Sequence, residues 1–418
     1  AFESDTCPMY LSMILSLILG FQAVPPVQQN APVDLTIPRN ALKRDAAKLW
    51  WMSYDVTIRD LEVPNNQRPF RMPLIVNGPW SEAGKHTLRV ASMDGNTQVS
   101  LLDAKSGIKG KGLQGEAMIQ APVPVNASNF ATISVSAEIL SFSSQIDEDL
   151  AMATPWPAQW PAQLSPALQP QALIESDEPI FKETITKLFG TNLRMNSPYL
   201  AAKKIVQYCC VNIQVSGNRL LGNRTSMRGL NVMGALAAAQ SGRGTRADLT
   251  CVCVAMLRAA GIPARPVIGL SELSRQAKEP TTWAEFFLPG SGWVPFSPWQ
   301  MQNGGMRSWK PDRSWRFFGT WKDLKENIAL SWSFAPGDGS TAYDAWGIWG
   351  WTRSAPWARF PTPVQLTQEP GRPDNVIRNL RPANISISMS SGGNLNERDY
   401  QNWLEGKRRP IRRVQDSR

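Results

Sequence analysis

Residues 244–265 read GTRADLTCVCVAMLRAAGIPAR, and this stretch decides the fold. Leu249, Val252 and Met256 belong to a set of apolar residues that recur at helical spacing with few polar gaps, which predicts a helix buried on most sides. Gly261 is typical of the position just after a helix, and Pro263 prevents the helix from continuing. The stretch therefore predicts a core helix that ends before Gly261.

Three short strands are predicted to follow this helix. Residues 266–270 form an apolar run of the length of a buried strand, and residues 283–288 form a second one after a polar loop. The turn sequence Pro-Gly-Ser-Gly at 289–292 connects it to a third strand at 293–296. These residues predict a helix, a strand and a hairpin in succession.

This succession resembles the core of the transglutaminase-like family, whose fold is related to that of papain. The resemblance covers roughly residues 195–335. It is most specific in the run 257–265, in Trp283-x-Glu285 and in Gly292-Trp293-Val294-Pro295, which fall in the expected order. It implies an α+β fold with a transglutaminase-like (papain-like) core, which in many such proteins follows a β-domain.

The resemblance also locates three catalytic positions. The family carries its nucleophile in a Gly-x-Cys-x-Asp turn that opens the helix, its base in His-x-Trp on the next strand, and an Asp after the hairpin. These positions hold Arg246, Thr281 and Ser297 here, so all three are substituted. The resemblance therefore implies a core that has lost the family's chemistry. We expect the three residues to lie near one another, because the motifs around them keep their order and spacing.

The cysteines inside the helix are not expected to replace the missing nucleophile. Cys251 lies more than one turn inside the helix, away from the terminal amides that lower a thiol pKa. A thiol nucleophile also needs a neighbouring base, and the one histidine of the chain, His86, lies far upstream. Arg246 places a cation at the positive end of the helix, with Asp248 as its nearest candidate partner.

Length and composition limit the classes of protein to which the chain can belong. At 418 residues the chain is long enough for two or three domains, and its 33 Pro indicate extended connections. The formal net charge of +10 indicates an acidic partner or an anionic surface. Without a recognised nucleic-acid motif, the charge does not favour nucleic acid.

The cysteines show no metal-binding pattern. Their spacings are not those of a zinc site, and we predict neither a metal nor a cofactor. We interpret them as small apolar residues on buried helices, with a disulfide between two helices as the alternative. The five are Cys7, Cys209, Cys210, Cys251 and Cys253.

Residues 9–21 form a charge-free apolar segment. Thirteen residues are short for a bilayer crossing and typical of a signal sequence, yet no Lys or Arg precedes them and the cleavage site is poor. We interpret the segment as an uncleaved membrane anchor, with a buried core helix as the alternative. The bulk of the chain is then expected on the extracytoplasmic, periplasmic side of a bacterial membrane.

Between this apolar segment and the core, the chain first alternates apolar and polar residues, as β-strands do, and then becomes rich in proline. Strand-like runs at 51–59, 87–90, 99–102 and 133–139, separated by Gly and Asn turns, predict a β-sandwich that contains His86 as a surface residue. Residues 153–172 predict an extended segment that is either draped over a neighbouring surface or acts as a spacer. Helices are predicted at 179–189, 198–212 and 230–240.

The C-terminal region is rich in tryptophan and basic residues. Trp and Arg are enriched at interface hot spots, and Trp also at membrane surfaces. The stretch 344–351 is hard to bury in one small core, and residues 407–413 could bind an acidic partner or anionic lipid if they are not a solvated tail. One strand is predicted at 385–389. The candidate partner-binding residues are Trp346, Trp349, Trp351, Trp357, Lys407, Arg408, Arg409, Arg412 and Arg413.

Together these patterns predict a catalytically inactive transglutaminase-like subunit of a membrane-associated assembly, for example a bacterial photosynthetic or respiratory complex. The alternatives are an enzyme of altered chemistry that uses Asp248 and Glu285, or a peptide- or glycan-binding module that uses the same cleft. The predicted organisation is an apolar N-terminal segment at 1–24, a Pro/Gln linker at 25–45, a β-sandwich at 46–145, a Pro-rich linker at 146–175, the core at 176–335 and a Trp-rich, basic, irregular extension at 336–418.

Overall fold

The computed structural model describes fourteen segments of the chain, and all of them lie in one compact unit, residues 37–418. Residues 1–40 lie outside the described residues, and they include the apolar segment 9–21. Among the helices of the described segments, none has the length and apolar character needed to cross a membrane. The segments are 41–59, 69–73, 78–92, 98–99, 108–111, 117–122, 130–171, 173–222, 227–271, 279–334, 345–347, 350–352, 365–366 and 381–406.

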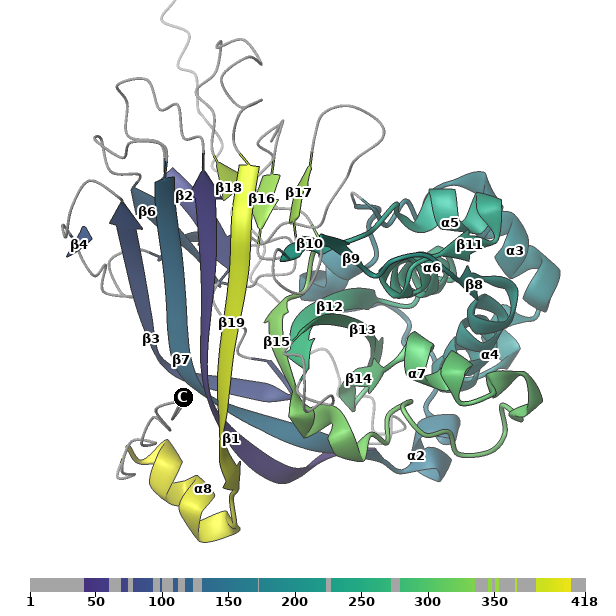
Figure 1. Cartoon of the computed structure of the whole chain (residues 1–418). Helices are drawn as coiled ribbons and strands as arrows, with labels where there is room; N and C mark the ends of the chain where they lie inside the picture. The colour runs from purple at the N-terminus through teal and green to yellow at the C-terminus, as the bar shows by residue number, and fades with distance from the viewer. Residues whose placement is uncertain are drawn as a thin grey trace, which may run out of the picture. The chain divides into compact units, whose positions relative to one another are not determined.

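Two antiparallel sheets form the β-domain (Figure 1). The five-stranded sheet has the order β19-β1-β7-β3-β4, and the six-stranded sheet has the order β17-β16-β18-β2-β6-β5. This arrangement confirms the predicted α+β fold with an N-terminal β-domain. The strands are β1 (Leu42–Arg59), β2 (Pro69–Pro73), β3 (Ser81–Ser92), β4 (Gln98–Val99), β5 (Ile108–Lys111), β6 (Ala117–Pro122), β7 (Phe130–Ile146), β16 (Ala345–Gly347), β17 (Gly350–Thr352), β18 (Gln365–Leu366) and β19 (Arg381–Asn394).

Strand β1 is an inner strand of the five-stranded sheet. It pairs with β7 along one side and with β19 along the other. It begins at Leu42, within the range predicted as a linker, because residues 42–45 continue the ladder with β7. The strand predicted at 385–389 is confirmed within β19, so the sheet takes strands from both ends of the chain.

The second half of the architecture is a four-stranded antiparallel sheet packed against helix α6 (Arg246–Ala259). Residues 247–258 of α6 are all buried, as the apolar pattern predicted. Gly261 follows the helix in the left-handed region with φ 75°, which confirms its predicted role as the stop. The strands, in the order β14-β13-β12-β15, are β12 (Ala264–Ser271), β13 (Glu279–Leu288), β14 (Gly292–Phe296) and β15 (Asn327–Ser331).

The remaining helices surround α6. The helices predicted at 179–189 and 198–212 are present with these bounds, whereas the helix predicted from residue 230 begins only at Ala235, because Gly234 at φ 105° is not helical. The helices and short strands are α2 (Glu148–Ala153), η1 (Ala162–Ala167), α3 (Pro179–Phe189), η2 (Leu193–Met195), α4 (Pro198–Asn212), β8 (Gln214–Val215), β9 (Leu220–Gly222), β10 (Met227–Leu230), α5 (Ala235–Ser241), β11 (Arg243–Gly244), α7 (Pro298–Asn303), η3 (Met306–Ser308), η4 (Lys322–Glu326) and α8 (Glu397–Leu404).

Two tryptophans fix the Pro-rich segment to its neighbours. Trp156 Nε1 donates to the Asn196 carbonyl at 2.7 Å, and Trp160 Nε1 donates to the Gly261 carbonyl at 2.8 Å. The ring of Trp160 also makes an edge contact with Phe287 of β13 at 6.2 Å. The segment is therefore draped over a neighbouring surface, which is one of the two predicted alternatives, although η1 interrupts its extended conformation.

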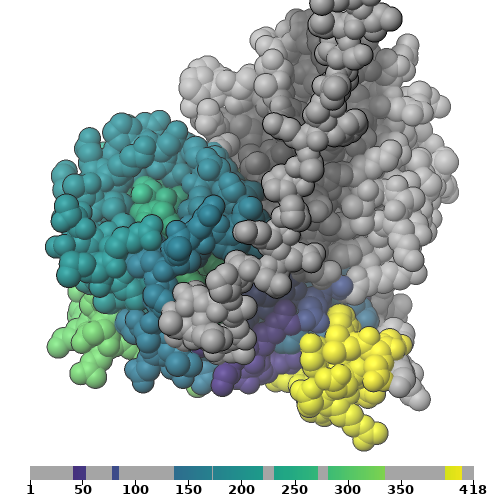
Figure 2. Space-filling model, turned by 180° about the vertical axis from the view of Figure 1, so that it is seen from behind, coloured from purple at the N-terminus to yellow at the C-terminus, as the bar shows by residue number. Residues whose placement is uncertain are grey.

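Hydrogen bonds join the five-stranded sheet to the segment before β15. Trp50 Nε1 donates to Ser141 Oγ at 2.8 Å and to the Lys325 carbonyl at 3.1 Å. Ser144 and Trp321 exchange backbone hydrogen bonds at 3.2 Å and 2.9 Å. At the other end of the chain, α8 lies beside the start of β1, where Figure 2 shows it in yellow next to the purple strand.

Candidate functional site

The turn that opens α6 is organised by one buried carboxylate. Thr245 caps the helix, accepting from Asp248 N at 3.3 Å, and Asp248 Oδ2 accepts from Thr245 N at 2.8 Å in return. Asp248 Oδ1 accepts from Met233 N at 2.7 Å and from Gly234 N at 3.0 Å. Burial raises the pKa of Asp248, and these hydrogen bonds lower it in part. Asp248 therefore ties the helix start to the segment before α5.

Gly244 allows this turn to close. A Cβ at Gly244 would lie 2.6 Å from the Cβ of Asp248 and 3.1 Å from its Oδ2. No side chain fits there without moving the carboxylate. The Gly-x-x-x-Asp spacing in the sequence is therefore a requirement of the turn itself, independent of any catalytic chemistry.

Arg246 is the first residue of α6, and its guanidinium lies over an aromatic ring. The centre of the guanidinium is 4.0 Å from the centroid of the Trp299 ring, which is cation–π geometry. Burial and the nearby Arg219 lower the pKa of Arg246. The sequence-based expectation that Asp248 is its partner is wrong, because the Asp248 carboxylate is occupied by three backbone amides. Arg246 turns to α7 instead.

Ser297, the second predicted position, caps α7. Its hydroxyl accepts from Gln300 N at 3.5 Å, and its backbone N donates to the Phe317 carbonyl at 2.9 Å. Trp299, which receives the Arg246 guanidinium, is the second residue of the same helix. The start of α6 and the start of α7 therefore meet through Arg246 and Trp299.

Thr281, the third predicted position, lies opposite Gly269 in the β12–β13 ladder. The side chain that joins β13 to α6 is that of its neighbour, since Thr282 Oγ1 lies 3.3 Å from Thr250 Oγ1 in a buried hydrogen bond. Thr282 was not among the site residues predicted from the sequence. Strand alternation could have done so, because Thr282 shares its face with Ala284 and Phe286, which pack in the cluster that contains α6. The convergence of Arg246, Thr281 and Ser297 stays a prediction.

The thiols of the core are far from reactive. Cys209, Cys210, Cys251 and Cys253 are buried and free, which confirms their interpretation as core residues. Burial, followed by the charges of Asp248 and Glu175, raises the pKa of Cys251 well above that of an ordinary thiol. Burial also raises the pKa of Cys253, which lies against Cys209 and Cys210. A raised pKa keeps these groups as neutral thiols, which are poor nucleophiles.

Glu285, the second carboxylate of the acid/base alternative, is bound to an arginine. Its Oε2 accepts from Arg265 Nε at 2.8 Å and lies 2.7 Å from Arg265 Nη2. The Arg265 guanidinium is itself stacked between two rings, 3.9 Å from Trp293 and 3.6 Å from Trp332. Burial raises the pKa of Glu285, and Arg265 lowers it in part.

Glu285 and Asp248 do not share a cleft in this arrangement. Glu285 alternates along β13 with Ala284 and Phe286, whose side chains pack toward α6, so Glu285 points to the opposite face of the sheet. Asp248 lies in α6 on the first face. The geometry therefore gives no support to an acid/base pair formed by these two carboxylates.

The partner-binding candidates lie mostly outside the described residues. Trp346 and Trp351 face each other in the ladder of β16 and β17, and their side chains are not described. Trp349, Trp357 and the basic residues between 407 and 413 lie in segments that the structure does not describe. His86 lies in β3 opposite Ala137, in the β-domain where the sequence placed it.

Residues 190–298 match the family described as the transglutaminase-like superfamily. The match contains the capped turn, α6 and the β13–β14 hairpin, and it ends just after Ser297. Residues 190–298 carry a transglutaminase-like core. The predicted resemblance is thereby confirmed for the part of the chain that holds its motifs. No curated protein sequence matches the chain.

Solved structures give wider but weaker similarities. A candidate cysteine protease from Cytophaga hutchinsonii is 13% identical with a TM-score of 0.48, over 84% of this chain and 93% of that protein. The periplasmic domain of TgpA from Pseudomonas aeruginosa is 14% identical with a TM-score of 0.30, over 61% of this chain and 90% of that domain. These similarities carry no argument about activity, and the transglutaminase-like core is identified from the family match at residues 190–298.

Proposed function

We propose that this chain is a catalytically silent transglutaminase-like protein that serves as a structural or accessory subunit of a membrane-associated protein assembly. The observation that carries the proposal is Arg246, which stands at the family's nucleophile position with its guanidinium over the Trp299 ring. Arginine stays protonated at physiological pH and has no lone pair to offer an acyl carbon. The position that supplies the nucleophile in the family is occupied here by a side chain that joins α6 to α7.

The other parts of a thiol mechanism have no candidate in the core. The only histidine of the chain, His86, lies in β3. The strand position of the family's base holds Thr281, whose hydroxyl does not titrate in the physiological range. The thiols of α6 are held neutral by burial. In the part of the core that the structure describes, we therefore identify neither an activated nucleophile nor a base beside it.

A structural role is supported by the contacts that the two buried carboxylates of the core make. The Asp248 carboxylate accepts three backbone hydrogen bonds of a turn, and the Glu285 carboxylate forms a buried ion pair with Arg265, which lies over the rings of two tryptophans. These groups stabilise the core, so the scaffold keeps its shape without chemistry. The Trp-rich stretch 344–351 and the basic run 407–413 are the segments that we propose to contact other subunits, with residues 9–21 at the membrane. The bulk of the chain is then extracytoplasmic.

Thiol reactivity tests the loss of catalysis. We expect the four core thiols of the wild-type chain to resist iodoacetamide until the protein unfolds. Arg246→Cys alone should add a thiol at the start of α6, whose alkylation midpoint lies below the ordinary value of about pH 8.5 because the terminal amides of the helix favour the thiolate. The triple variant Arg246→Cys, Thr281→His, Ser297→Asp should shift that midpoint downward, because a histidine then pairs with the thiol.

A matched control keeps Thr281 and combines only Arg246→Cys with Ser297→Asp. Without the histidine the alkylation midpoint should stay at the value of the single Arg246→Cys variant. A single Arg246→Cys variant that alkylates rapidly at pH 6 would contradict the proposal, because the core would then contain a base that we have not identified.

A further inference from the structure

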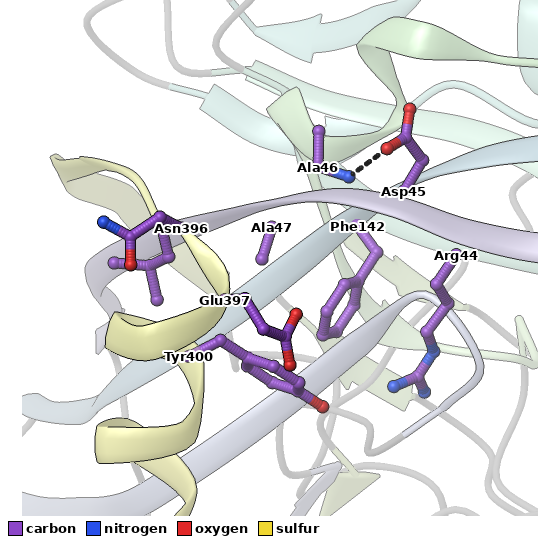
Figure 3. Close-up of a pocket in the computed structure, with 9 residues that line it drawn as sticks. Arg44, Asp45, Ala46, Ala47, Phe142, Asn396, Glu397 and Tyr400 are labelled. Atoms are coloured by element: carbon purple, nitrogen blue, oxygen red, sulfur yellow. Dashed lines mark hydrogen bonds between the residues drawn. The ribbon is translucent and has the colours of Figure 1, made fainter.

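A cavity of about 360 Å³ lies between the start of β1 and helix α8, outside the transglutaminase-like core (Figure 3). The chain reaches it from both ends, since Ala46 and Ala47 of β1 form one wall and Leu395 to Tyr400 form another. Leu395 N donates to the Ala47 carbonyl at 2.9 Å, which fixes the two walls to each other. The volume lies within the range of small-molecule sites.

Two aromatic rings form part of the cavity lining, beside the polar side chains of Arg44, Asp45, Asn396 and Glu397. The rings of Phe142 and Tyr400 make an edge contact with centroids 5.8 Å apart. The Arg44 guanidinium lies over the Phe142 ring at 4.4 Å from its centroid. The cavity thus already accommodates one guanidinium of the chain against an aromatic face, in cation–π geometry.

The charge of that guanidinium is neutralised within the protein. Arg44 forms an ion pair with Glu82 and donates to the Gly78 carbonyl at 3.0 Å. Glu397 contributes a further carboxylate to the cavity lining, and Figure 3 shows this carboxylate beside the Tyr400 ring. Its Oε1 accepts from Gln401 Nε2 at 2.8 Å, which leaves Oε2 for a ligand. The carboxylate of Asp45 points away from this group and accepts from Ala46 N at 2.8 Å.

The electrostatics at Tyr400 agree with this charge count. Burial and the charges of Glu82 and Glu397 raise the pKa of Tyr400, and Arg44 lowers it only in part. Burial is the largest cause of this shift, and the two carboxylates of Glu82 and Glu397 add to it against the one guanidinium of Arg44. An anionic ligand would meet repulsion here, whereas a cation would be attracted.

We propose that this cavity binds a small organic cation, a guanidinium or ammonium group carried on a short apolar stem. The cation lies against the Tyr400 ring and the Glu397 carboxylate, and the stem packs on Ala47 and Leu395. A site of this kind combines cation–π attraction with one charge-assisted hydrogen bond, and neither contribution involves the transglutaminase-like core.

Isothermal titration calorimetry of the full chain with 1-butylguanidinium tests the proposal, with N-butylurea as the neutral ligand of the same shape. We expect butylguanidinium to bind and butylurea to bind more weakly, with the difference shrinking as salt is added. Glu397→Gln should weaken butylguanidinium binding by about 1.5- to fivefold, as for a solvent-accessible ion pair. Glu405→Gln, which removes the same charge at the far end of α8, should leave binding unchanged.

The ring contribution is tested separately. Tyr400→Phe keeps the ring and should retain binding, whereas Tyr400→Leu should weaken it by about two- to fivefold. Circular dichroism of each variant shows whether α8 has remained folded. Equal binding of butylurea and butylguanidinium, equal effects of Glu397→Gln and Glu405→Gln, or no measurable binding of butylguanidinium would each overturn the proposal.

Discussion

The carboxylate of Asp248 shows how one buried side chain can hold the start of a helix to the segments around it. In a Gly-x-Cys-x-Asp turn the aspartate could be taken for part of the chemistry. In this chain its two oxygens accept from the backbone N of Thr245, Met233 and Gly234. Removing the carboxylate would leave buried donors without acceptors, which costs more than the hydrogen bonds themselves contribute.

We therefore expect Asp248→Ala to lower the free energy of unfolding by about 2–4 kcal/mol, from the lost cap and the orphaned amides. Asp248→Asn should cost less, because its amide oxygen can still accept from one or two of them. Urea denaturation followed by tryptophan fluorescence measures both. Asp177→Ala, at an exposed acid, is the control. A cost for Asp248→Ala no larger than the control's would show that the turn closes without this residue.

The same carboxylate predicts a pH dependence. Because its pKa is raised in the folded protein, the folded state retains a proton at pH values where the unfolded state, with a pKa of about 3.9, has lost it. The stabilisation is complete below that value and is lost as the pH rises through the folded pKa. The stability difference between wild type and Asp248→Asn should therefore shrink as the pH rises from about 4 through this window. A difference that grows with pH would reverse the assigned direction.

At the scale of elements, local signals in the sequence were sufficient for α6 and for the strands around it. Gly261 and Pro263 fixed the end of the helix, and the turn at 289–292 fixed the hairpin, because both signals act within a few residues. Strand β1 was predicted from residue 51 but starts at Leu42, since its first residues are defined by pairing with β7. The partner of Arg246 was also missed, because Trp299 lies in a different helix and only tertiary packing brings it near.

The Pro-rich segment gives a prediction about an element. Trp160→Ala would lose the hydrogen bond to Gly261 and the ring contact with Phe287, and should lower the free energy of unfolding by about 1–3 kcal/mol. We expect limited proteolysis to cut within residues 154–170 faster than in the wild type, because the part of the segment around residue 160 then loses its contacts with Gly261 and Phe287. Gln159→Ala, at an exposed neighbour, should leave the cleavage rate unchanged. Equal cleavage of the two variants would mean that Trp160 does not hold the segment.

At the scale of the whole molecule, the proposal of an assembly subunit depends on the tryptophans of the stretch 344–351. Replacing Trp346, Trp349 and Trp351 together with Ser should release the chain from its partners, because large apolar patches usually mark interaction sites. Sedimentation of the protein after detergent extraction of its native membranes measures the release. Trp160→Ala, which weakens the chain without touching this stretch, is the control. Wild-type protein that sediments as a monomer would contradict the proposal.

The pairing of β1 with both β7 and β19 has a consequence for how the chain must be made. Synthesis delivers β7 soon after β1, so one side of β1 is satisfied early. The strand for its other side, β19, begins about 320 residues after β1 ends, which at roughly 5–20 residues per second is a wait of about 16–65 s. During that time an 18-residue strand presents an open row of amides and carbonyls to any other nascent chain. The yield of folded protein should therefore depend on how crowded the ribosomes are and on whether a holdase covers that edge.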